Sequence, residues 1–140
     1  MFFERFNSVR TFFDAQIDMA KEAGYVETIM GRRRYIPEIK ASNWKMRQFG
    51  ERVAQNTPIQ GTAADLMKKA MIDVHKGLEI SGSRGKILLQ VHDELLLEVP
   101  EDEVSEVCDL VVDRMEGAMT LNVPSVAEWG AGETWYHCKG

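Results

Sequence analysis

The sequence has little cysteine, no long apolar run and no repeated or low-complexity segment, and these absences exclude several classes of protein. Its two cysteines, Cys108 and Cys138, belong to no Cys-x-x-Cys pair, which indicates a reduced intracellular protein rather than a disulfide-bonded or cysteine-zinc fold. Because no stretch of about 18 apolar residues occurs, we expect no membrane span. Charges at Glu4 and Arg5 are unlike a secretory signal, so a cytoplasmic location is expected.

Acidic residues outnumber basic ones, and the net charge of -5 argues weakly against a simple nucleic-acid coat. The two signs are nonetheless segregated along the chain. Seven basic and two acidic residues lie between Arg32 and Arg52, whereas ten acidic residues and one basic residue lie between Asp93 and Glu116. A polyanion could bind the first stretch, and the second would repel it unless a cation intervened. The alternative is two solvated faces of opposite sign.

The apolar pattern and the turn residues predict one domain with an α+β fold. Apolar residues at helical spacing alternate with short runs of strand-forming residues. We expect Pro58 to interrupt the chain between two helices, and Thr62 with Asp65 to start the second of them. The expected elements are helices over 2–20, 43–55, 62–77 and 102–119, antiparallel hairpins over 25–36 and 86–99, and a last strand over 122–129.

The most informative stretch is residues 90–94, where three polar side chains follow one another between two apolar strand-like runs. Only His92 and Asp93 separate the two runs, which is typical of a hairpin, and Asp tolerates the backbone that such a turn needs. A carboxylate at this turn could hold Mg²⁺, which prefers oxygen ligands and is often bound by one or two carboxylates together with substrate phosphates. An ordinary exposed turn residue is the alternative.

Several longer stretches, read together, resemble the DNA polymerase I family, that is, the bacterial-type family A DNA polymerases. The stretch Gln-Val-His-Asp-Glu-Leu-Leu-Leu-Glu-Val-Pro at 90–100 is similar to motif C of that family. Three further stretches resemble family blocks, in order along nearly the whole chain: 24–37, 56–68 and 129–135. The resemblance implies that the chain is a C-terminal part of a polymerase palm, with an antiparallel sheet made of the motif C hairpin and the C-terminal strand.

The resemblance also implies roles for the residues of motif C. Asp93 matches an aspartate that, with a second carboxylate, holds the catalytic Mg²⁺ ions in a two-metal transfer of a nucleotide to the primer 3′ hydroxyl. Glu94 would tune this site from nearby. His92 matches a residue that lies close to the primer terminus.

A second group of residues is implied to bind DNA. Arg52, Asn56 and Gln60 recur every four residues, so a helix would place them on one face. Family residues that match them line the primer-template minor groove, where donors can check the shape of a base pair without reading its sequence. Lys45, Arg47 and residues 32–34 could contact backbone phosphates. A polar helix face and a solvated hairpin edge are the alternatives.

Two parts of the family's active site are not found in the 140 residues. They are the first catalytic aspartate, in motif A, and the fingers helix that binds the incoming deoxynucleoside triphosphate, both of which lie upstream in the family. The chain is therefore expected to be inactive alone and to need the upstream motif A, fingers and thumb segment as a partner, in cis or as a separate chain. A primer-template binding module without chemistry and a stranded fragment are the alternatives.

Overall fold

The computed structural model describes residues 2–138. The chain divides into two compact units, Met1–Asp65 and Leu66–Gly140. Both units combine helices with a two-stranded antiparallel sheet, so the expected α+β class is confirmed. Among the described helices, none is both long enough and apolar enough to cross a membrane.

The first unit begins with two helices, α1 (Phe2–Arg5) and α2 (Asn7–Ala23), where one was expected. The chain breaks between them at Phe6, whose φ of -120° and ψ of 60° are not helical. As predicted, Gly24 ends the helical region: its φ is 82°, and its amide donates to the Ala20 carbonyl at 2.9 Å. A residue with a Cβ adopts this left-handed conformation only at a cost.

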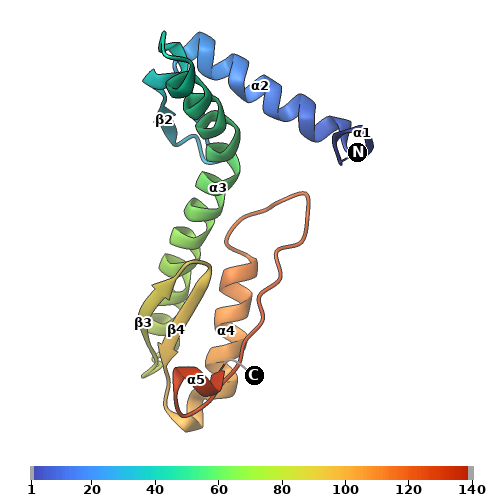
Figure 1. The fold of residues 1–140 in the computed structure, drawn as a ribbon. Helices are drawn as coiled ribbons and strands as arrows, with labels where there is room; N and C mark the ends of the chain where they lie inside the picture. Colours follow the sequence, from blue (N-terminus) through green and yellow to red (C-terminus); the bar gives the residue numbers. More distant parts are fainter. Residues whose placement is uncertain (1, 139–140) are drawn as a thin grey trace. The chain divides into compact units, whose positions relative to one another are not determined.

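The expected first hairpin is present as β1 (Tyr25–Glu27) and β2 (Arg33–Tyr35), followed by a short 3₁₀ helix, η1 (Pro37–Lys40). Figure 1 shows α2 and this hairpin beside the first part of the long helix α3. Their apolar side chains form a small core against that helix, in which Val26 and Ile36 are completely buried. The other members are Ala20, Ile39 and Ala54, with Ile17 and Val53 packed against them.

Helix α3 (Trp44–Ser81) is a single helix of 38 residues, so the expected interruption at Pro58 is wrong. Its start was predicted correctly, since the Asn43 side chain accepts the amides of Lys45 and Met46 at 2.9 and 3.2 Å. A proline inside a helix costs roughly 3 kcal/mol because one backbone hydrogen bond is lost. Packing along so long a helix offsets a local cost of this size.

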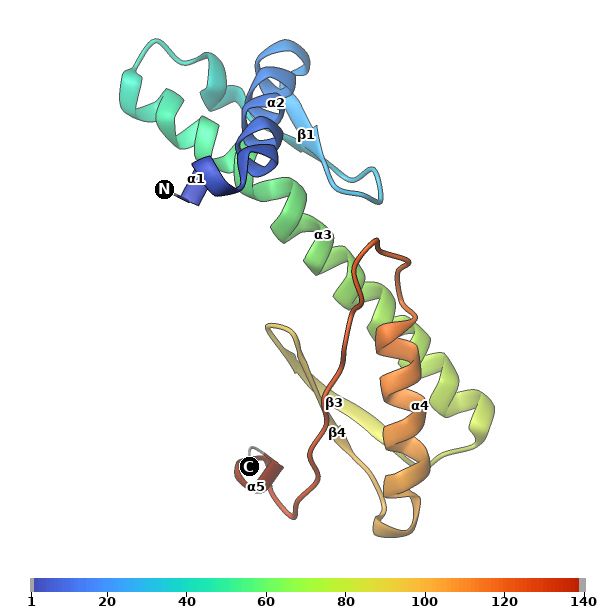
Figure 2. The same cartoon turned by 90° about the vertical axis from the view of Figure 1, so that its right-hand side faces the viewer.

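The second unit contains the hairpin of β3 (Lys86–Val91) and β4 (Glu94–Glu98), a 3₁₀ turn, η2 (Glu101–Glu103), and helix α4 (Val104–Glu116). Figure 2 shows the hairpin and α4 alongside the last part of α3. The core between these elements is built on Val74, Leu78 and Val107. A register shift between Ile87 and Leu89 leaves one extra residue in β3, which is a β-bulge.

The expected strand over 122–129 is wrong. The structure gives no regular element between α4 and the short helix α5 (Trp135–Cys138), within the part of the chain that it describes. A strand needs a neighbouring strand for its hydrogen bonds, and Pro124 has no amide to donate. The β3–β4 sheet has two strands only, so the C-terminal strand is not part of it.

Candidate functional site

The turn between β3 and β4 carries the residues that the sequence singles out for catalysis. Val91 pairs with Glu94, so His92 and Asp93 form a two-residue turn, as predicted. The positive φ that the turn requires, 55°, belongs to His92 and not to Asp93. The Gln90 side-chain amide donates to the His92 carbonyl, which ties the turn to its own strand.

The chemistry of this turn fits one part of a magnesium site. Asp93 and Glu94 are both exposed and place two carboxylates side by side in the chain. The Asp93 carboxylate makes no side-chain hydrogen bond or ion pair among residues 2–138, so its oxygens are available to a cation. Over the same residues there is no group of three His, Cys, Asp or Glu that could hold a metal ion. Further oxygen ligands would have to come from water, phosphate or another carboxylate.

Three of the predicted DNA-binding residues share one exposed face of α3. Arg52, Asn56 and Gln60 are all exposed, and α3 is helical through all three positions. At 1.5 Å per residue, they span about 12 Å along the helix axis, which is three to four base pairs of duplex DNA. Their side-chain donors therefore form a polar row that is as long as roughly three to four base pairs of a DNA groove.

The basic residues of the first unit differ in their exposure and in whether their guanidinium groups already have partners within the chain. The Arg47 guanidinium is half-buried and donates to the Ala41 carbonyl at 3.4 Å. Arg33 donates to Glu27 at 2.7 Å and lies 4.6 Å from the centre of the Tyr25 ring. The hydrogen bond to Glu27 is the main reason why the pKa of Arg33 is raised. Arg34, opposite Val26 in the hairpin, is exposed, and its guanidinium makes no ion pair with the carboxylates of residues 2–138.

The third arginine of residues 32–34, Arg32, belongs to a polar cluster that the sequence did not indicate. Its Nε donates to Asp65 Oδ1 at 2.7 Å, and Thr28 Oγ1 donates to Asp65 Oδ2 at 2.7 Å. Thr62 and Asp65, expected at the start of a helix, instead lie in the middle of α3, where they are 9% and 7% exposed. The partners of Asp65 are 33 and 37 residues away in the sequence, so a local capping pattern could not reveal them.

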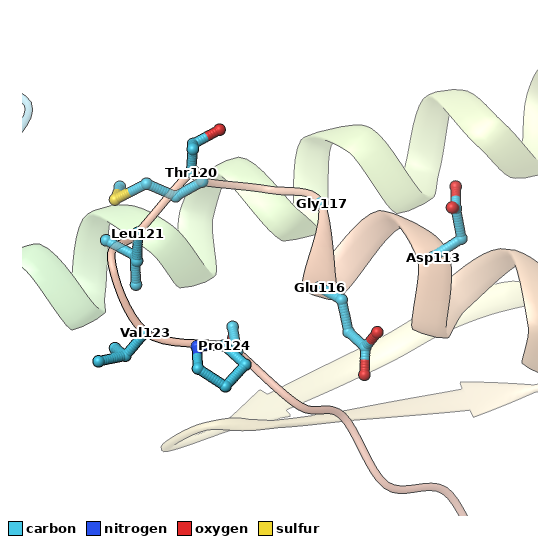
Figure 3. A pocket seen from close by; sticks show the side chains of 9 residues that line it. Asp113, Glu116, Gly117, Thr120, Leu121, Val123 and Pro124 are labelled. Atoms are coloured by element: carbon cyan, nitrogen blue, oxygen red, sulfur yellow. The ribbon is translucent and has the colours of Figure 1, made fainter.

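A pocket of about 440 Å³ in the second unit follows the end of α4 and holds none of the predicted site residues. Figure 3 shows its wall, with Glu116 on the helix and Val123 and Pro124 on the segment that follows. The Glu116 carboxylate accepts the Ala127 amide at 2.9 Å. That contact gives Glu116 a structural role in holding the segment.

Comparison with known proteins gives one consistent family. The model of "DNA polymerase family A" matches residues 1–137. DNA polymerase I of Bacillus caldotenax is 47% identical over 138 residues, which are 99% of this chain and 16% of that protein. DNA polymerase I of Pseudomonas aeruginosa is 48% identical over 134 residues, 96% of this chain and 15% of that protein.

Among solved structures, the POL domain of Pol1 from M. smegmatis, in complex with DNA primer-template and dNTP, has a TM-score of 0.96 and 46% sequence identity. The similarity covers 99% of this chain and 24% of that one. The chain thus spans about a sixth of the length of the curated relatives it matches.

Proposed function

Because the chain belongs to DNA polymerase family A, we propose that it supplies one part of the catalytic centre and one part of the primer-template surface of a DNA polymerase. The observation that supports this proposal is the β3–β4 turn, which presents the Asp93 carboxylate to solvent. From the resemblance of residues 90–100 to motif C, we assign Asp93 the role of that motif's aspartate. The remaining polymerase segments, with a second metal carboxylate and the site for deoxynucleoside triphosphates, would act in cis or as a separate chain.

In this proposal Asp93 would hold Mg²⁺, and Glu94 would add negative charge beside it. When bound, the metal supplies electrostatic stabilisation of the charge that develops on the transferred phosphoryl group. The hydrogen bond from the Gln90 side chain to the His92 carbonyl would hold the turn, including the left-handed backbone of His92, in the shape that presents Asp93. His92, exposed at the same turn, would lie near the primer terminus.

The exposed row of Arg52, Asn56 and Gln60 would lie along the minor groove of the primer-template duplex. Every base pair presents acceptors at equivalent places there, so these donors would bind a correctly shaped pair of any sequence. Arg34 and Arg47 would contact phosphates, which position the duplex but carry no sequence information.

The test is primer extension by a polymerase that contains this chain, with Asp93→Asn as the variant and Asp113→Asn as the matched control. Asp113 is an α4 carboxylate whose side chain is 75% exposed. Asp93→Asn should reduce extension by at least about 100-fold, since a metal ligand is lost, and should leave primer-template affinity nearly unchanged. Unreduced extension by Asp93→Asn would leave the non-catalytic DNA-binding module as the better account.

A further inference from the structure

Helix α3 has a weak point beside the proposed DNA-binding row. Pro58 cannot donate a backbone hydrogen bond to the Ala54 carbonyl, one turn earlier. Asn56 and Gln60 lie on either side of this proline on the exposed face. Before the proline, Ala54 anchors the helix in the core of the first unit. After the proline, the anchor is polar.

Four hydrogen bonds from the first hairpin make this polar anchor, and they end on residues 61, 62 and 65 of α3. Thr28 Oγ1 and Arg32 Nε each donate to Asp65 at 2.7 Å. The Ile29 amide donates to Thr62 Oγ1 at 3.1 Å, and Arg32 Nη2 donates to the Gly61 carbonyl at 3.1 Å.

The helix itself is adapted to receive the hairpin. Thr62 Oγ1 donates to the Pro58 carbonyl, so the same hydroxyl links the proline turn to the Ile29 amide. At Gly61 the hairpin approaches so closely that a Cβ would lie 2.7 Å from Thr28 Cγ2. Hydrogen bonds to a charged, nearly buried carboxylate such as Asp65 are stronger than those between neutral exposed groups.

We propose that Asp65, with Thr28 and Arg32, is a positioning group that holds α3 in one conformation across Pro58 and so sets the geometry of Gln60, the residue of the row that follows the proline. We call this group the brace. The inference rests on the proposed function for the part that concerns DNA. Arg52 and Asn56 both precede Pro58, on the side of the apolar anchor at Val53 and Ala54, so their positions do not depend on the brace.

The first experiment measures amide hydrogen exchange in the 140-residue chain. Thr28→Val removes the hydroxyl with little change of shape, and Asp65→Asn removes the charge. Both should increase exchange of the amides of residues 59–65 about tenfold, since each weakens the charge-assisted hydrogen bonding of Asp65. Thr28→Val also removes the acceptor of the Arg32 amide, which donates to Thr28 Oγ1 at 3.2 Å. The matched control is Glu27→Gln, which removes a carboxylate from the same hairpin but breaks only the exposed pair with Arg33. Thr28→Val remains informative even where Asp65→Asn does not fold.

The second experiment measures primer-template affinity in a double-mutant cycle. Gln60→Ala should weaken binding about fivefold in the unaltered chain and less than twofold when Thr28→Val is also present, because the brace no longer positions Gln60. The effect of Arg52→Ala should be the same in both backgrounds.

Unchanged exchange at residues 59–65 in Thr28→Val would overturn the inference. So would an effect of Gln60→Ala that is equal in the two backgrounds. An unaltered chain that binds no primer-template would refute the proposed DNA surface instead, and the exchange of residues 59–65 would then decide whether the brace exists.

Discussion

Replacing Gly61 by alanine should push the first hairpin away from α3, although alanine is the better helix former. The new Cβ would lie 2.7 Å from Thr28 Cγ2 and 3.4 Å from Arg32 Nη2. Carbon atoms in contact normally lie about 3.5–4.0 Å apart, so the threonine methyl must move by about 1 Å. The arginine end is flexible and can move at little cost. The threonine is held by its hydrogen bond to Asp65.

Two opposing terms set the size of the effect. Overpacking costs about 1–3 kcal/mol, while the change from glycine to alanine inside a helix contributes about 1 kcal/mol of stability. Gly61→Ala alone should therefore lower the free energy of unfolding by about 0–2 kcal/mol. Thr28→Ser removes the clashing methyl, at a cost of about 1 kcal/mol, and keeps the hydroxyl. The double variant should then be about as stable as the unaltered chain, with a coupling of about 2 kcal/mol.

Urea unfolding followed by far-ultraviolet circular dichroism gives the free energy of unfolding of the parent chain, the two single variants and the double variant. Ala63→Gly, at an exposed position of the same helix, is the control that measures the helix-propensity term by itself. Additive effects of Gly61→Ala and Thr28→Ser would refute the close packing of the hairpin on α3. A Gly61→Ala chain that is more stable than the parent by the full propensity term would refute it as well.

Three further results are expected. The hydrogen bond from the Ser83 hydroxyl is the main reason why the pKa of Glu103 is lowered to about 2. The ionised Glu103 therefore stabilises the fold above its ordinary pKa of 4.5, and this stabilisation is lost as pH falls toward 2. Ser83→Ala should raise the pKa of Glu103 in an NMR titration, and an unchanged pKa would contradict this. Gly24→Ala should lower the free energy of unfolding by about 1 kcal/mol, because the φ of 82° disfavours a Cβ; no loss in urea unfolding would speak against it. If Arg34, Arg47 and the exposed Lys45 contact phosphates, primer-template affinity measured by fluorescence anisotropy should fall roughly 40-fold from about 50 to about 200 mM salt, and salt-independent binding would exclude those contacts.

Local patterns predicted the parts of the fold whose causes are local. Both hairpins follow from short runs of strand-forming residues and a turn, and the end of α2 follows from Gly24. The break expected at Pro58 is wrong because a local helix-breaking rule says nothing about the tertiary contacts that hold α3 on both sides of the proline.

The local geometry of the candidate site residues was predictable to the same degree, while their roles stay predictions. The motif C stretch and the four-residue spacing of Arg52, Asn56 and Gln60 are visible in the sequence, and the structure places the first at a turn and the second on one exposed face. The brace was not predictable, because Thr62 and Asp65 followed a pattern that usually caps a helix. Their partners come from a hairpin about thirty residues earlier, and only the folded chain brings these groups together.

The central claim is that this chain provides one share of a polymerase active site and needs the other share from elsewhere. Primer extension with Mg²⁺ and all four deoxynucleoside triphosphates tests it most directly, with the purified chain alone and with the chain joined to the upstream polymerase segment of a bacterial DNA polymerase I. We expect no extension by the chain alone, and extension by the joined protein that is lost in Asp93→Asn. Extension by the chain alone that disappears in Asp93→Asn would contradict it, since the 140 residues would then provide every metal ligand themselves.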